Sequence, residues 1–170
     1  MLYLLLTMGI IELPAPPTEQ EREAANYSEM IHLYMDLLKI LESNFQKEIG
    51  REFENIFVKC KDELTGQAKM IFHGFDLAGD AQDALIKKIA AEFSGMGKAA
   101  EGRLALLTSF NKLIYLLIMR MKKVLGRGLT EKTIMEMMNI LDYVEKYRQD
   151  TEMMNYVKGN LMDYMNQIKS

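Results

Sequence analysis

Glu29 and His32 form a Glu-x-x-His motif, the spacing at which one turn of a helix can present two ligands to one metal ion. A di-metal centre in a helical bundle needs this motif twice, together with two further inward-facing glutamates. The other histidine, His73, has Met70 instead of an acid at the matching position. Because half of the ligand set is missing, Glu29 and His32 are more simply interpreted as solvent-facing neighbours of an apolar stripe.

His32 could also act in phosphotransfer, which requires an exposed histidine on a helix beside a lysine and a small residue. Three bulky residues, 33–35, follow His32 and are expected to crowd it, whereas His73 abuts a glycine in an expected loop. A metal-binding or histidine phosphotransfer bundle using His32 and Glu29 therefore stays as the alternative from the enzyme class.

The sequence lacks the residues that other kinds of catalysis require. No serine or cysteine has a base that the sequence assigns to it, and neither of the glycine-rich phosphate-binding motifs occurs. Cys60, the single cysteine, occupies an apolar position of a helical pattern, so we interpret it as a core thiol of a protein in a reducing cytoplasm. The sequence thus predicts no cofactor and no enzymatic activity.

A basic cluster of four residues follows the most apolar part of the chain: Arg120, Lys122, Lys123 and Arg127. Cations at the C-terminal end of a helix complement the negative end of its dipole, which gives the cluster a structural explanation. A small anion-binding patch is the functional alternative. Aromatic residues that could stack on bases do not alternate with these cations, and the formal net charge is -3, so the sequence argues against direct contact with nucleic acid.

Methionine is unusually frequent, with 15 in the chain and a concentration toward the C-terminus. Flexible thioethers fill irregular core gaps, but they also line adaptable binding surfaces. Adjacent pairs such as Met137-Met138 cannot both lie at the centre of one narrow helical stripe, so some must meet a partner or water. We therefore predict a groove or homodimer seam on the last helix, formed by Met137, Met138, Leu141, Met153, Met154 and Val157.

The elements that carry these residues are predicted to be helices. The segment from Leu113 to Met119 is apolar on every side of a helix, so it must be enclosed by other helices or by lipid. Lys112 and Arg120 interrupt the apolar run far short of the roughly 20 residues that a bilayer requires. We therefore expect no membrane span, and an all-α bundle of five or six helices around a central buried helix over about 98–125.

The chain divides at a proline-rich segment. Residues 1–13 form a short apolar strap or the tail of an upstream domain, residues 14–17 form a linker, and residues 18–170 form the bundle. A T-x-x-E capping box at Thr18 predicts the first helix of the bundle, and glycines near 50, 66, 95–97 and 126 predict later helix ends. The last helix is expected from Thr130 onward, with a kink or projection near residue 150, where the apolar stripe lapses.

The opening LYLLLTMGIIEL resembles the closing helix and strand of the winged-helix-like PATAN-type domain of multidomain bacterial regulators. The remainder is similar to the helical region that can follow that domain, with the segments 48–50 and 123–126 in the places of recurrent apolar-glycine helix ends. The resemblance implies a non-catalytic module of a signalling or regulatory protein, which can be a fragment of a longer chain. It assigns no functional residue.

We therefore expect a cytoplasmic, non-enzymatic helical module that binds a protein partner or a second copy of itself. A third hypothesis is the dimerising part of a nucleic-acid-associated regulator, whose contact with nucleic acid lies in another domain.

Overall fold

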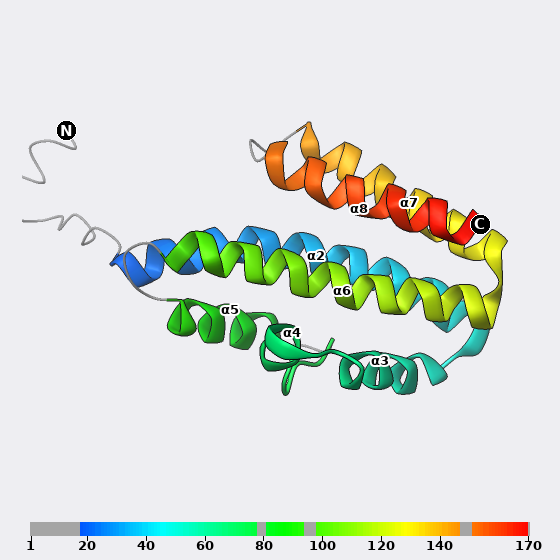
Figure 1. The fold of residues 1–170 in the computed structure, drawn as a ribbon, viewed down its shortest axis with the longest axis horizontal. Helices are drawn as coiled ribbons and strands as arrows, with labels where there is room; N and C mark the ends of the chain where they lie inside the picture. Colours follow the sequence, from blue (N-terminus) through cyan, green and yellow to red (C-terminus); the bar gives the residue numbers. More distant parts are fainter. Residues whose placement is uncertain (1–17, 78–80, 94–97, 147–150, 170) are drawn as a thin grey trace, which may run out of the picture.

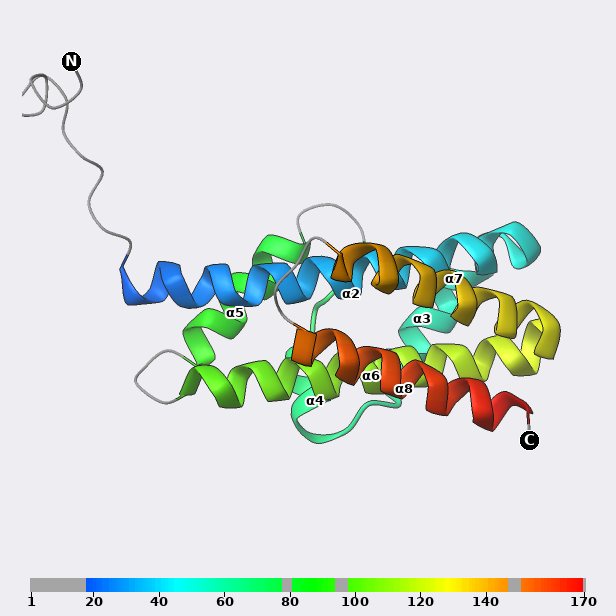
Figure 2. The same cartoon turned by 90° about the horizontal axis from the view of Figure 1, so that it is seen from above.

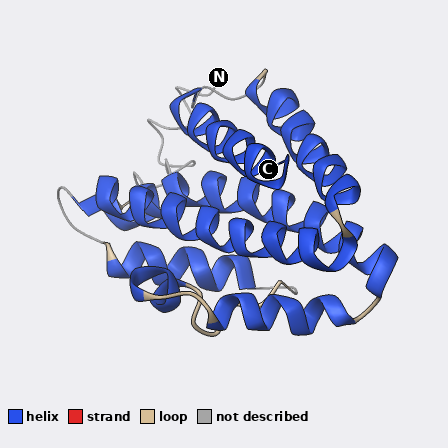
Figure 3. Ribbon diagram, turned by 45° about the vertical axis from the view of Figure 1, so that its right-hand side comes forward, coloured by secondary structure: helices blue, strands red, loops and turns tan. Residues whose placement is uncertain are grey.

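The computed structural model describes residues 18–77, 81–93, 98–146 and 151–169, and the regular elements in these residues are all α-helices (Figure 3). They are α2 (Glu19–Ile49), α3 (Glu52–Asp62), α4 (Gly66–Ile71), α5 (Ala81–Glu92), α6 (Lys98–Leu125), α7 (Arg127–Glu145) and α8 (Thr151–Lys169). The predicted all-α bundle is confirmed. The predicted strap 1–13, the linker 14–17 and the helix end predicted near residues 95–97 lie outside the described residues.

The helices form three layers (Figure 1). The two longest helices, α2 and α6, lie side by side and run in the same direction, while α3, α4 and α5 return beneath them (Figures 1 and 2). The pair α7 and α8 packs on the opposite face of this central layer. All three layers contribute buried side chains to one hydrophobic core.

Local sequence signals set several helix ends. Helix α2 begins directly after Thr18, where the capping box places its start. It ends at Ile49 because Gly50 adopts a left-handed conformation, with φ of 60°, and donates its amide hydrogen to the carbonyl of Gln46. Gly126, with φ of 84°, is the single residue between α6 and α7. Helix α7 thus starts at Arg127, three residues earlier than predicted.

Helix α6 is the central buried helix that the sequence predicts. Over Leu113 to Met119 every side chain is buried or half-buried, and four of them are at most 1% exposed. A segment of α6, Ala100–Leu125, is long and apolar enough to cross a membrane, with a mean hydropathy of 1.4. However, 56% of its most apolar window is buried inside the bundle, because α2, α3, α4, α7 and α8 pack around this helix. The other layers therefore provide the enclosure that the apolar circumference requires.

The number of helices differs from the prediction, since the described residues form seven instead of five or six. Gly66 begins the short helix α4, and the predicted last helix is two helices, α7 and α8, packed against each other. Arg127, at the start of α7, contacts Lys169, at the end of α8, so the pair is antiparallel. The lapse in the apolar stripe near residue 150 thus marks a chain reversal, and the predicted kink or projection is wrong.

Candidate functional site

Glu29 and His32 lie exposed on α2, and neither is part of an assembled metal site. His32 Nδ1 lies 3.4 Å from Ser28 Oγ, and His73 is exposed just beyond the end of α4. Within the described ranges, no three His, Cys, Asp or Glu side chains gather as a metal-binding group. The expected crowding of His32 is wrong, because residues 33–35 are buried in the core while the imidazole faces outward. The phosphotransfer alternative stays a prediction.

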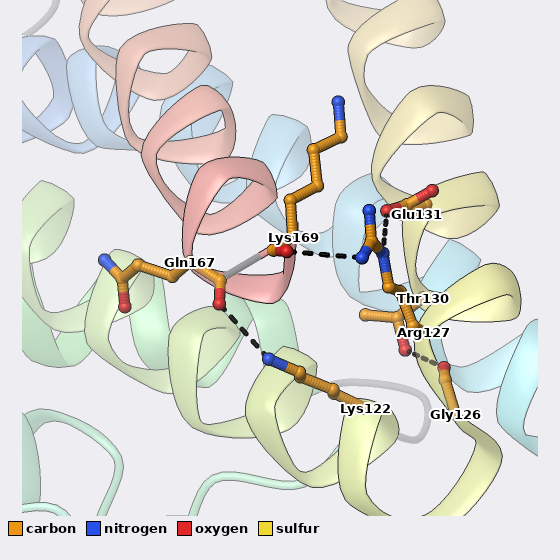
Figure 4. Close-up of polar contacts among 7 residues, drawn as sticks. All are labelled: Lys122, Gly126, Arg127, Thr130, Glu131, Gln167 and Lys169. Atoms are coloured by element: carbon orange, nitrogen blue, oxygen red, sulfur yellow. Dashed lines mark hydrogen bonds and ion pairs between the residues drawn. The ribbon is translucent and has the colours of Figure 1, made fainter.

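The basic cluster is divided among three structural contacts and one exposed lysine. The Arg120 guanidinium lies 2.5 Å from a carboxylate oxygen of Glu63, the residue directly after α3, and this ion pair joins two layers. Lys122 donates to the carbonyl of Gln167 at 3.2 Å, and Arg127 donates to the carbonyl of Lys169 at 3.2 Å (Figure 4). Lys122 and Arg127 therefore cap α8, because the last backbone carbonyls of a helix have no N–H donor within the helix itself.

The cations thus act on a different helix from the one expected. The sequence places them at the end of α6, but two of them complement the negative end of the α8 dipole. Arg127 also forms an ion pair with Glu131, at 2.7 Å (Figure 4). Among the four, Lys123 alone makes no hydrogen bond or ion pair to another described residue. Two of the four side chains in the candidate anion patch therefore hold the end of α8, and Arg120 is paired with Glu63.

Most residues of the predicted partner seam lie inside the bundle. Met137, Leu141, Met154 and Val157 are 0% exposed, and Met153 is 4% exposed. They form the contact of α7 and α8 with each other and with the central layer, so a partner could reach them only if this pair of helices separated. Met138 alone is half-buried. Core packing therefore explains five of the six residues.

A groove does lie on α7 and α8, but other methionines form it. We call it the methionine groove, and it has a volume of about 290 Å³. Its methionines are Met135, Met138, Met162 and Met165, and its remaining lining residues are Ile134, Asn139, Leu161, Asn166 and Lys169. Met135 and Met162 are 59% and 58% exposed, and because both line the same groove they form a shared apolar surface. The sequence could have indicated that Met135 and Met162 are exposed, because both lie outside the apolar stripe of their own helix.

The two helices of the groove are held to each other and to the central layer by polar contacts. Lys158 of α8 lies 2.6 Å from Asp142 and 2.5 Å from Glu145 of α7, and hydrogen bonds to these carboxylates raise the pKa of Lys158. The buried amide of Asn44 on α2 donates to Thr133 Oγ1 at 3.1 Å and to Glu136 at 2.7 Å. These contacts therefore hold the two helices of the groove in place.

Two buried groups are chemically inert in this arrangement. Cys60 is 0% exposed, and burial raises the pKa of its thiol to about 11, with a further increase from the Glu63 carboxylate and an opposing effect of Arg120. Burial also raises the pKa of Tyr34 well above its ordinary value. Among the described residues the Tyr34 hydroxyl has no partner in good hydrogen-bonding geometry, and the nearby Asn111 side chain opposes the increase in its pKa, although this effect is the smallest of those acting on it. The core-thiol interpretation of Cys60 is confirmed, and neither group is poised for nucleophilic chemistry.

Comparison with known protein families, with curated proteins and with solved structures finds no match to this chain. The resemblance to the region after a PATAN-type domain therefore stays a prediction from short segments.

Proposed function

We propose that this chain is a non-enzymatic helical interaction module that self-associates through the methionine groove. The observation that supports the proposal is the pair of methionines, Met135 and Met162, that flank the groove with more than half of their surfaces exposed. Unbranched thioether side chains adapt their shape to an opposing surface, and exposed apolar patches mark sites of association.

A second copy suits this surface because the groove carries little charge. Lys169 is the single charged residue among its nine lining residues, and Asn139 and Asn166 supply the other polar groups. Two identical surfaces bring identical charges together, so a charged centre would repel its own copy. Lys169 is the last described residue of α8, so a two-fold axis perpendicular to the helices would place the two lysines at opposite ends of the contact.

The size of the groove predicts a weak, reversible dimer. A standard stable interface uses about 20–30 residues and about 800 Å² from each partner, whereas nine residues line this groove. We therefore expect dissociation in the micromolar range or weaker. Such an interface would serve a module whose association is controlled by local concentration or by attachment to other domains. A role in a cytoplasmic signalling or regulatory protein of bacteria belongs to the same proposal and depends on the stated resemblance.

Sedimentation velocity over a dilution series tests the proposal. The wild-type protein should change from monomer to dimer as its concentration rises, and Met135→Glu should remain monomeric because it places a charge in the apolar contact. Met70→Glu is the matched control, since Met70 on α4 is 60% exposed and lies outside the groove. A monomer at every concentration, or equal loss of the dimer in both variants, would contradict the proposal.

A further inference from the structure

The largest of the described clefts lies on the layer opposite the methionine groove, between α2, α3 and residues 74–77. It has a volume of about 520 Å³, within the usual range of small-ligand sites. Its lining residues are Glu42, Phe53, Glu54, Phe57, Val58, Lys61, Gly74, Phe75, Asp76 and Leu77. The cleft therefore combines aromatic and aliphatic walls with several charged groups.

The floor of the cleft is aromatic and fixed by packing. Phe53, Phe57 and Phe75 line the cleft and are each at most 4% exposed, so only a small part of each ring is accessible there. Neighbouring ring centroids lie 6.1 Å apart between Phe53 and Phe57 and 6.3 Å apart between Phe57 and Phe75. Val58, which is 50% exposed, and half-buried Leu77 extend this apolar surface. The cleft can therefore receive an apolar body without rearrangement of its floor.

The rim of the cleft is acidic. Glu42, Glu54 and Asp76 line it, and none of the three has an ion-pair partner among the described residues. Lys61 is the single lining cation, so three carboxylates and one ammonium give a formal local charge of -2. An acidic rim around an apolar floor complements a ligand that carries a cation on an apolar body.

Lys61 already makes this type of contact within the chain. Its ammonium lies 5.3 Å from the centroid of the Phe57 ring and donates a hydrogen bond to the carbonyl of Phe75. An alkylammonium group thus packs on an aromatic wall of this cleft and finds an oxygen acceptor there. The contact also occupies Lys61. Glu42 accepts a hydrogen bond from Gln46 at 3.1 Å and Asp76 accepts one from the Leu77 amide at 2.7 Å, but neither bond neutralises the charge of the carboxylate.

We propose that this cleft binds a small organic cation with an apolar body, such as an alkylammonium compound. The apolar body lies on the Phe53, Phe57 and Val58 wall, and the cationic group meets the carboxylates of Glu42, Glu54 and Asp76. This site is independent of the methionine groove and of self-association.

Three probes with the same body and different charges test the site: 4-phenylbutylammonium, 4-phenylbutanol and 4-phenylbutyrate. Binding is followed by methyl resonances of Val58 and Leu77 in a ¹³C-labelled protein. The ammonium compound should bind most tightly and the carboxylate least tightly, and added salt should weaken the first. Each exposed carboxylate is expected to contribute about two- to fivefold in affinity.

Variants then separate charge from packing. Glu42→Gln with Glu54→Gln should weaken the ammonium compound about 4- to 25-fold while the affinity for the alcohol stays the same. Glu152→Gln, on α8 in the opposite layer, is the matched control and should change nothing. Equal affinity for the three probes, the tightest binding by the carboxylate, or no effect of the double variant would overturn the proposal. Thermal melts of the variants confirm that the amide replacements leave the fold intact.

Discussion

Two glycine-to-alanine substitutions should change stability in opposite directions, although both lie within helices. Gly102 is buried in α6, and a Cβ there would stand 2.4 Å from Tyr27 Oη and 2.9 Å from Cγ of Phe93. Gly159 lies exposed in α8, and a Cβ there would meet no atom within 4 Å apart from the neighbouring backbone of α8 itself. The pair therefore compares the same chemical change with and without a packing conflict.

The magnitudes follow from two opposing effects. Alanine stabilises a helix interior by about 0.5–1 kcal/mol relative to glycine, because it loses less backbone entropy on folding. Gly159→Ala should therefore raise the free energy of unfolding by this amount. Inserting a methyl group into a filled site costs about 1–3 kcal/mol. Tyr27 is 0% and Phe93 is 7% exposed, so neither ring can move aside into solvent. Gly102→Ala should thus be about 1–3 kcal/mol less stable than Gly159→Ala.

Urea unfolding followed by far-UV circular dichroism measures both values. The slope of the transition should be the same in both variants, since neither changes the surface exposed on unfolding by much. If Gly102→Ala proved as stable as Gly159→Ala, the close approach of α6 to α2 and to Phe93 would be refuted.

Three further predictions concern polar groups that are buried or half-buried. Tyr34→Phe should leave the stability unchanged or slightly raise it, because the Tyr34 hydroxyl lacks a well-formed hydrogen bond. Tyr164→Phe should lower the stability by about 1 kcal/mol, because it removes the 3.1 Å hydrogen bond to the Asn111 carbonyl, and thermal melts distinguish the two variants. Lys158→Met should lower stability at neutral pH. The folded-state pKa of Lys158 is raised above its unfolded value of about 10.4. The difference in unfolding free energy between wild type and variant should therefore be largest below about pH 10.4 and should shrink as the pH rises through the folded-state pKa, which paired urea titrations would show. Cys60 should resist iodoacetamide in the native protein at pH 8 and react on unfolding, because burial raises the pKa of its thiol to about 11. Rapid labelling of the native protein, measured by mass spectrometry, would contradict the buried position of Cys60.

Much of the architecture could be read from local patterns. The start of α2 after Thr18, its end at Gly50 and the end of α6 before Gly126 follow from a capping box and from glycines, whose effects on the backbone are local. The enclosure of residues 113–119 follows from an apolar circumference that water cannot solvate cheaply. The reversal between α7 and α8 was harder to predict, because a lapse in an apolar stripe fits a kink, a projection or a turn.

The candidate surfaces depended on tertiary packing. Sequence composition predicts that some C-terminal methionines must face outward, but it selected five residues that the bundle buries and missed Met135, Met162 and Met165. The face of a helix that becomes buried is the one that its neighbours cover, and the antiparallel packing of α7 and α8 decides which faces of these two helices are covered. The basic cluster shows the same dependence, because Lys122 and Arg127 meet the end of α8, a helix that lies more than 20 residues away in the chain.

The sequence by itself determined an all-helical chain, the buried character of α6 and the absence of several catalytic motifs, because each depends on residue types and on spacings within one helix. Only the tertiary structure decided which methionines remain exposed, what the cations contact, and that three carboxylates meet an aromatic floor. Those features join residues from different helices, and their positions depend on how the layers pack.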